Sequence, residues 1–282
     1  MFTRSARHLS VLIRASAVTA AALLGVSLAQ AQSPSAHHAH LAAQQLMQRD
    51  LVGVPGKQVT LTATEVPPGV SSAPHKHEAQ VFVYVVQGHM IMQVRGGPRL
   101  TLGPGQTFYE NPTDIHSVSA NASKTEPAKF LAFVIKDKDK PGLIPVPRNQ
   151  ADAEDQAQPS ASPDEASAAA APQKTGPVLM TRDVIGAPGR QVVMAVVAQR
   201  PGARGKPHRH NAQVFVYVLQ GKVIMQVKGG PRETLGVGQT FYENPSDIHT
   251  VSDNASATEP AKFLAILIKD KDKPITSPVP AE

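Results

Sequence analysis

Hydrophobic residues gather in short runs along this chain, and glycine or proline separates one run from the next. The run 81–86 holds only valine, phenylalanine and tyrosine, which is typical of a strand buried on both faces. Gly88 ends it, and further strands are predicted at 90–94, 107–109 and 130–135. The pattern therefore predicts many short strands joined by tight turns.

The same pattern occurs twice. HKHEAQVFVYVVQG, starting at His75, recurs as HRHNAQVFVYVLQG at His208, an offset of 133 residues. GQTFYENPTDIH recurs as GQTFYENPSDIH at the same offset, and residues 49–147 align with 182–280 without a gap. Each copy has the size of a small domain. The chain is therefore predicted to be all-β, with two tandem antiparallel barrels or jelly rolls.

The segments outside the copies differ in composition. Residues 148–181 are rich in Ala, Pro and Ser and are predicted to be a flexible linker. Residues 32–48 form a histidine-containing tail with HHAH at 37–40. Within this tail, Leu41 to Met47 reads as a short helix.

Residues 1–31 have the three parts of a secretory signal peptide. Three arginines precede an apolar run, and Ala29-Gln30-Ala31 offers a small-x-small cleavage site. The apolar run is too short to span a bilayer, so no membrane insertion is expected after cleavage. The sequence predicts a periplasmic or secreted protein that acquires any metal outside the cytoplasm.

Charge and cysteine content narrow the functional classes. The 282 residues carry a formal net charge of +6, of which the three signal arginines supply half. The remaining lysines alternate with aspartates in KDKDK runs at 136–140 and 269–273, so a nucleic-acid partner is not predicted. The chain has no cysteine, which excludes disulfides and thiolate ligands. A small-molecule substrate or ligand is the expected partner, together with pairing of the two domains within the chain.

Histidines provide the candidate chemistry. His75 and His77 are two residues apart at the start of a strand, so their imidazoles project from one face. His116 follows the turn 111–114. Imidazoles that face a barrel interior are costly unless they bind something, and a divalent metal is the common answer. His208, His210 and His249 repeat the pattern in the second copy.

Two motifs in each copy resemble those of the cupin superfamily, G(X)5HXH(X)3-4E(X)6G and G(X)5PXG(X)2H(X)3N. The matching residues are Gly69, His75, His77, Gly88, Gly105 and His116 in the first copy, with Asn121 one residue late, and Gly202, His208, His210, Gly221, Gly238, His249 and Asn254 in the second. The resemblance implies two double-stranded β-helix barrels, that is, a bicupin. It also implies one divalent transition metal per domain, with Fe, Mn, Zn, Cu and Ni all open.

The chain departs from the family pattern at the acidic ligand. That position holds Val81 in the first copy and Val214 in the second, and strand alternation turns the adjacent glutamines to the other face. The usual set of three His and one Glu is thus reduced to three His. Glu110 and Glu243 occupy normally apolar inward positions, so each carboxylate is expected inside its barrel. Metal ligation or acid–base catalysis, and a structural ion pair or turn cap, are both open roles for them.

Three functions follow from these residues. Cupins that lack the acidic ligand include Fe(II) dioxygenases, so the resemblance implies a mononuclear non-haem metal oxygenase acting on a small organic compound. The same fold also serves metal-dependent binding or sensing without turnover. Metal-assisted lyase or isomerase action is the third function. It needs an internal base, and Glu110 or its equivalent Glu243 is the candidate catalytic residue.

Overall fold

A computed structural model of the chain describes residues 41–147 and 178–279. The predicted signal peptide, the HHAH cluster and most of the predicted linker lie outside these residues. The strands of the first barrel are β1 (Ala42–Asp50), β2 (Lys57–Val66), β3 (His75–Lys76), β4 (Ala79–Gln87), β5 (Met90–Val94), β6 (Leu100–Leu102), β7 (Thr107–Glu110), β8 (Ile115–Asn121), β9 (Ala128–Asp137) and β10 (Ile144–Pro145). Those of the second barrel are β11 (Val178–Asp183), β12 (Arg190–Gln199), β13 (His208–Arg209), β14 (Ala212–Gln220), β15 (Lys222–Val227), β16 (Glu233–Gly236), β17 (Thr240–Glu243), β18 (His249–Asn254), β19 (Ala261–Asp270) and β20 (Ser277–Pro278).

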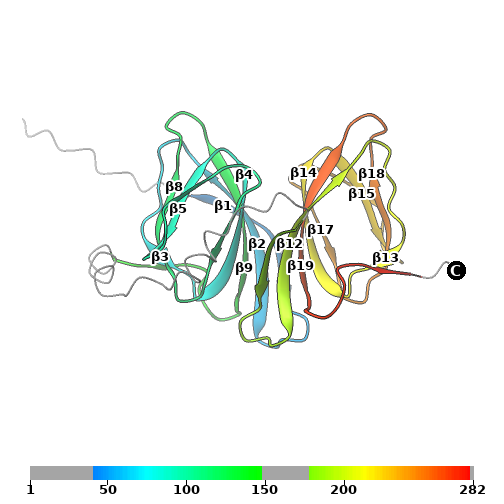
Figure 1. The fold of residues 1–282 in the computed structure, drawn as a ribbon, viewed down its shortest axis with the longest axis horizontal. Coiled ribbons are helices and arrows are strands. Elements are labelled where there is room, and N and C mark those ends of the chain that lie inside the picture. The colour runs from blue at the N-terminus through cyan, green and yellow to red at the C-terminus, as the bar shows by residue number, and fades with distance from the viewer. Residues whose placement is uncertain (1–40, 148–177, 280–282) are drawn as a thin grey trace, which may run out of the picture. The chain divides into compact units, whose positions relative to one another are not determined.

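Each barrel consists of two five-stranded antiparallel sheets. In the first barrel the strand orders are β1-β2-β9-β4-β7 and β10-β3-β8-β5-β6, and the second barrel repeats both orders. Figure 1 shows the two layers of each barrel, with β2, β4 and β9 in one and β3, β5 and β8 in the other. The all-β prediction and the four strand predictions of the first copy are confirmed. No helix that could span a membrane occurs in residues 41–147 or 178–279.

Strand β4 is buried on both faces, as predicted. Its alternate residues Val81, Val83 and Val85 belong to the core of the first barrel. Phe82 and Tyr84 point the other way, into a second hydrophobic cluster that also contains side chains of the second barrel. Because both faces are covered by apolar groups, the strand carries hydrophobic residues without alternation.

The cluster that contains Phe82 joins the two barrels. Within it the rings of Phe133 and Phe215 lie 5.0 Å apart in an edge-to-face arrangement. Gln80 and Gln213, both buried, hydrogen-bond to the backbone of the opposite barrel. Both glutamines therefore face away from the interiors of their own barrels, as strand alternation predicted, and the contacts support the predicted pairing of the two domains.

The helix predicted at 41–47 is wrong, because this segment is part of strand β1. β1 pairs with β2 from Ala42↔Glu65 to Asp50↔Gln58, and Met47 is buried against the cluster that joins the barrels. Pairing with a long neighbouring strand satisfies the backbone groups of β1, so tertiary structure overrides the weak local helix propensity. The sheets that contain β1 and β11 therefore begin before residues 49 and 182, at which the alignment of the copies placed the start of each domain.

Candidate metal centres

The three histidines of the first copy meet beside strands β3 and β8, in the sheet with the order β10-β3-β8-β5-β6. His75 lies in β3 directly opposite His116 in β8, and His77 follows β3. The His75 ring is 4.9 Å from the His77 ring and 5.0 Å from the His116 ring. His208, His210 and His249 repeat this arrangement, and in each triad the candidate ligand atoms lie within 4.8 Å of one another. The structure thus brings together both predicted sets.

Backbone carbonyls orient two of the imidazoles in the first barrel. The Nδ1 of His75 donates a hydrogen bond to the carbonyl of Ala73 (2.8 Å), and the Nδ1 of His77 donates one to the carbonyl of Gly142. A carbonyl oxygen can only accept, so each Nδ1 carries the proton. In the neutral ring this leaves Nε2 as a lone-pair donor, which is how outer-shell partners prepare histidines for metal binding.

The second barrel shows the consequence of this orientation. The Nδ1 atoms of His208 and His210 donate to the carbonyls of Lys206 (2.7 Å) and Ile275 (2.8 Å), while their Nε2 atoms lie 3.1 Å apart. Two unprotonated nitrogens cannot hydrogen-bond to each other. Two nitrogens that bind one metal ion at about 2.1 Å are about 3.0 to 3.4 Å apart in octahedral or tetrahedral geometry. The observed separation fits a shared cation.

A carboxylate stands beside each triad. Glu110 in β7 is directly opposite Val81 in β4, so both side chains project into the barrel from adjacent strands. Its Oε2 lies 3.2 Å from Nδ1 of His116 and 3.7 Å from Nε2 of His77. The acid missing from position 81 is therefore supplied by the neighbouring strand at the same level of the barrel.

The second barrel has the same relation. Glu243 is opposite Val214, and its carboxylate oxygens lie 3.2 Å from Nδ1 of His249 and 3.9 Å from Nε2 of His210. Both glutamates are almost completely buried, with 2% of Glu110 and 3% of Glu243 exposed. A carboxylate at this depth needs positive charge nearby.

The electrostatics of the first triad favour an added cation. Burial and the neighbouring His116 lower the pKa of His75 to about 4, so this ring is neutral at pH 7. Burial alone would raise the pKa of Glu110, but the His116 and His77 rings more than offset it and bring the pKa below its ordinary value. Nε2 of His116 and Nε2 of His249 have no hydrogen-bond partner among the described residues. A divalent ion would satisfy such orphaned atoms, so the donor set fits a metal.

Other residues of the two motifs serve the fold. Asn121, buried, donates from Nδ2 to the carbonyls of Val66 (3.0 Å) and Glu126 (2.8 Å), which ties β8 to the ends of β2 and β9. Gln93 closes a turn by donating to the carbonyl of Gly97 (2.9 Å).

Sequence reasoning missed the residues that hold the histidine rings in place. Four carbonyls accept from the ring nitrogens, and the ring of Phe108 stacks on that of His116 at 5.6 Å. The carbonyls carry no sequence signal, because every residue has one. Phe108 is apolar at an inward strand position and is indistinguishable in sequence from an ordinary core residue.

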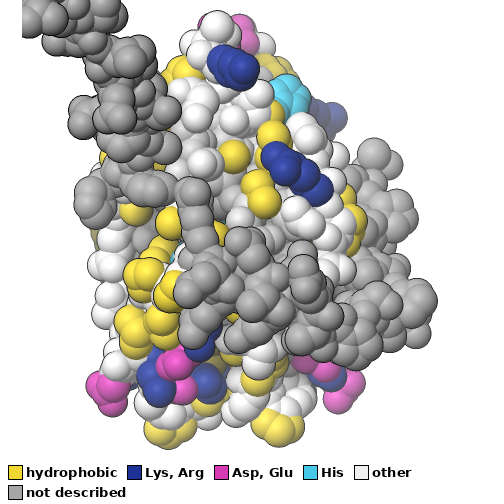
Figure 2. Space-filling model, turned by 90° about the vertical axis from the view of Figure 1, so that its left-hand side faces the viewer, with side chains coloured by type: hydrophobic (Ala, Val, Ile, Leu, Met, Phe, Trp, Pro, Cys, Tyr) yellow, Lys and Arg dark blue, Asp and Glu magenta, His cyan; other side chains and the backbone are white. Residues whose placement is uncertain are grey.

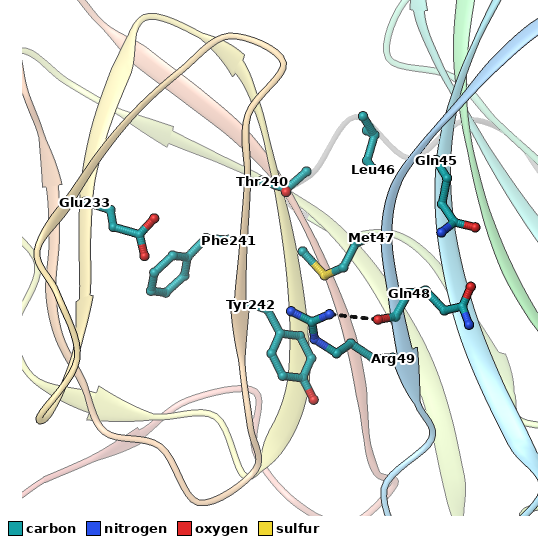
Figure 3. Close-up of a pocket in the computed structure, with 9 residues that line it drawn as sticks. All are labelled: Gln45, Leu46, Met47, Gln48, Arg49, Glu233, Thr240, Phe241 and Tyr242. Atoms are coloured by element: carbon teal, nitrogen blue, oxygen red, sulfur yellow. Dashed lines mark hydrogen bonds between the residues drawn. The ribbon is translucent and has the colours of Figure 1, made fainter.

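A separate cavity of about 570 Å³ lies where β1 passes β16 and β17. Figure 3 shows Arg49 and Tyr242 pointing toward each other in it, and the guanidinium lies 4.9 Å from the ring centroid. None of the predicted site residues lines this cavity. On the face shown in Figure 2, Lys and Arg side chains lie singly or beside acids, not in one continuous patch.

Known proteins were compared with the chain by sequence and by structure. A family model described as a cupin domain matches residues 63–134 and 195–267, together about half of the chain. The search of curated proteins found no match.

Solved structures similar to this fold include an oxalate decarboxylase from Bacillus subtilis at pH 4.6, with a TM-score of 0.52 and 18% identity over 81% of this chain and 75% of that one. A second structure of that enzyme, from work on its Mn(II) centres, gives 0.51 and 19% over 82% and 76%. An oxalate decarboxylase studied for its substrate binding mode gives 0.52 and 18% over 82% and 76%. At these identities the likeness shows the fold alone. Together with the family match over both repeats, it establishes that the chain belongs to the cupin family and carries two cupin domains.

Proposed function

We propose that this protein is an exported metal enzyme that binds one divalent transition metal ion in each barrel and acts on a small organic acid, hydroxy acid or sugar. The observation that carries the proposal is the pair of histidine Nε2 atoms 3.1 Å apart in the second barrel, next to a buried carboxylate. His75, His77 and His116 would hold the ion in the first barrel, and His208, His210 and His249 in the second. When bound, the metal would supply Lewis-acid polarisation of a substrate oxygen.

The buried glutamates favour acid–base chemistry. A hypothesis of oxygenase action rested on a site without a carboxylate, yet Glu110 lies within 3.7 Å of His77 Nε2. In the metal-bound site a carboxylate so close to the donor atoms is either a fourth ligand or a base that takes a proton from bound substrate. Burial excludes water from this group and strengthens its interaction with a cation. Lyase or isomerase action is therefore the reaction class that the geometry supports best.

Export is part of the proposal. Residues 1–31 have the signal-peptide pattern, so the mature chain is expected to begin at Gln32 in the periplasm or the medium. Intact-mass measurement of protein recovered from those fractions tests this directly. A full-length chain that still starts at Met1 in the cytoplasm would contradict it.

The first experiment measures metal content by elemental analysis of protein purified from its native compartment. Two ions per chain are expected, falling to one in His77→Ala and to none in the double variant His77→Ala/His210→Ala. His89→Ala is the matched control, because His89 is exposed and outside both triads. Unchanged metal in the double variant would refute the site.

The second experiment identifies the reaction class. Metal-loaded protein is given small hydroxy and keto acids while an oxygen electrode and chromatography follow the reaction. Product formation without oxygen uptake, lost in Glu110→Gln/Glu243→Gln, supports lyase or isomerase action. Oxygen consumed in proportion to substrate would instead make the protein an oxygenase. Thermal stabilisation by a compound that gives no product would make it a binding module.

A further inference from the structure

The two barrels differ most in charge along the segment that leads into the first histidine ligands. Residues 64–78 of the first copy carry a formal charge of −1, from Glu65, Lys76 and Glu78. The equivalent residues 197–211 carry +4, from Arg200, Arg204, Lys206 and Arg209. Pro67, Ser71 and Ala73 stand where the second copy has Arg200, Arg204 and Lys206. The three added cations are exposed.

In the first barrel this segment is attached to strand β8. Ser71 forms an isolated bridge with Ala120 of β8, and the backbone N–H of Ser72 donates to the carbonyl of Ser119 (2.8 Å). The segment is therefore held against β8 next to His75, of which only 7% is exposed.

In the second barrel those bonds are replaced. The carbonyl of Ser252, equivalent to that of Ser119, accepts from the side chain of Gln199 (3.0 Å). The backbone N–H of Gly205 donates instead to Asp253 Oδ1 (3.1 Å). A Cβ at Gly205 would lie 2.7 Å from the Ser252 carbonyl oxygen, so only glycine allows this approach. In the second barrel the side chain of Gln199 thus makes the bond to Ser252 that a backbone N–H makes to Ser119 in the first barrel. The first copy has the buried Val66 at the position of Gln199.

A groove of about 520 Å³ opens along this rearranged segment. Gln199, Arg200, Arg204, Gly205 and Ser252 line it together with His208, which is only half-buried. One acid lies beside the groove. Asp253 accepts a hydrogen bond from the backbone N–H of Gly205, and its carboxylate lies 3.8 Å from Arg232. The groove is therefore lined both by cations and by one candidate metal ligand.

We propose that the two centres are specialised, and that the second barrel binds a small anionic ligand, of the size of a carboxylate, more tightly than the first, with this groove as its entrance. The inference rests on the proposed metal sites. Cations around a concave entrance raise the local concentration of anions, and guanidinium groups pair with carboxylates in two-point contacts. The first centre lacks these cations and its His75 is buried, so such ligands are expected to bind there more weakly.

The test uses Co²⁺-loaded protein and two probes, azide as the anion and imidazole as a neutral ligand. Binding is followed by the visible absorption of the metal in His75→Ala/His77→Ala, which keeps the second centre, and in His208→Ala/His210→Ala, which keeps the first. Azide is expected to bind the second centre about tenfold more tightly than the first, and less tightly as salt is added.

The charge is tested separately in the full chain, so the conclusion does not depend on the ligand variants folding. Arg200→Gln/Arg204→Gln is expected to weaken azide binding several-fold at the tighter of two phases and to leave imidazole binding unchanged. Lys271→Gln/Lys273→Gln removes the same charge beyond the far end of β12 and should change neither. Adding Pro67→Arg/Ser71→Arg to the first copy should not create tight binding, because the bond from Ser72 to Ser119 still holds that segment against β8 beside the buried His75.

Equal azide affinities at the two centres would overturn the proposal. So would a loss of imidazole binding that matches the loss of azide binding in Arg200→Gln/Arg204→Gln, because charge would then not be the cause. If the protein takes up no Co²⁺ at all, the metal sites themselves are wrong, and this outcome is distinct from both of the others.

Discussion

Replacing Gln213 by leucine tests the contact that joins the two barrels. The Gln213 side chain is fully buried, and its amide makes three hydrogen bonds. Nε2 donates to the carbonyl of Asp50 (2.9 Å) and to the hydroxyl of Tyr242 (2.8 Å), and Oε1 accepts from the N–H of Val52 (2.8 Å). Two of the three groups belong to the first barrel, so the substitution acts directly on the interface.

The expected cost follows from the groups left behind. Leucine has a similar size and keeps the packing, but it leaves two backbone groups and one hydroxyl without their partner. A buried group that loses its hydrogen bond costs about 1–3 kcal/mol. Because Val52 and Tyr242 are partly accessible to water, we take the lower part of this range and expect a loss of about 3 kcal/mol. This is a large part of a typical unfolding free energy of about 5–15 kcal/mol.

Urea unfolding, followed by circular dichroism and tyrosine fluorescence, measures this loss. Gln226→Leu is the matched control, because that amide makes a single bond to the carbonyl of Gly230 within one turn (3.0 Å). Gln80→Leu should behave like Gln213→Leu, since Gln80 bonds to Asp183, Ile185 and Tyr109 in the same way. If Gln213→Leu shifts the midpoint no further than Gln226→Leu does, the barrels are not held together by these amides.

Three further predictions concern the triads and their surroundings. The pKa of His75 is lowered to about 4 in the folded state, so the unfolded chain binds more protons between about pH 4 and 6.5. The metal-free protein should therefore lose up to roughly 3 kcal/mol of stability as pH falls through this window. Urea midpoints should show a shallower pH slope in His75→Gln, and equal slopes would contradict neutral burial of the ring. Asn121→Ala removes side-chain hydrogen bonds to three carbonyls and one N–H. The free energy of unfolding should therefore fall by about 2–4 kcal/mol. Metal content should not change, and a loss of metal from the folded variant would assign Asn121 to the site. Metal at a hundred times its dissociation constant should stabilise the folded state by about 2.7 kcal/mol per centre, seen as a higher melting temperature that is absent in His77→Ala/His210→Ala.

The sequence was sufficient for features that depend on local pattern. The HxH spacing placed two imidazoles on one face of the chain, and alternation turned Gln80 and Gln213 away from their barrels. The resemblance to the cupin pattern placed Glu110 inside its barrel. The duplication predicted that both domains have the same strands and the same histidine site. Local pattern failed at β1, where the helix predicted at 41–47 gave way to pairing with β2.

The amino-acid sequence by itself determined the strands, the two domains and the six histidines, because the period of two and the repeat offset are properties of neighbouring residues along the chain. Only the tertiary structure decided that Glu110 stands level with Val81, and that Gln80 and Gln213 bond to the opposite barrel. Only the tertiary structure showed that a groove runs along the segment before His208, while the equivalent segment of the first barrel is bridged to β8. These features depend on strand register and on backbone contacts between residues distant in the chain. Neither a contact of a backbone carbonyl nor the register between two strands can be read from the type of any single residue.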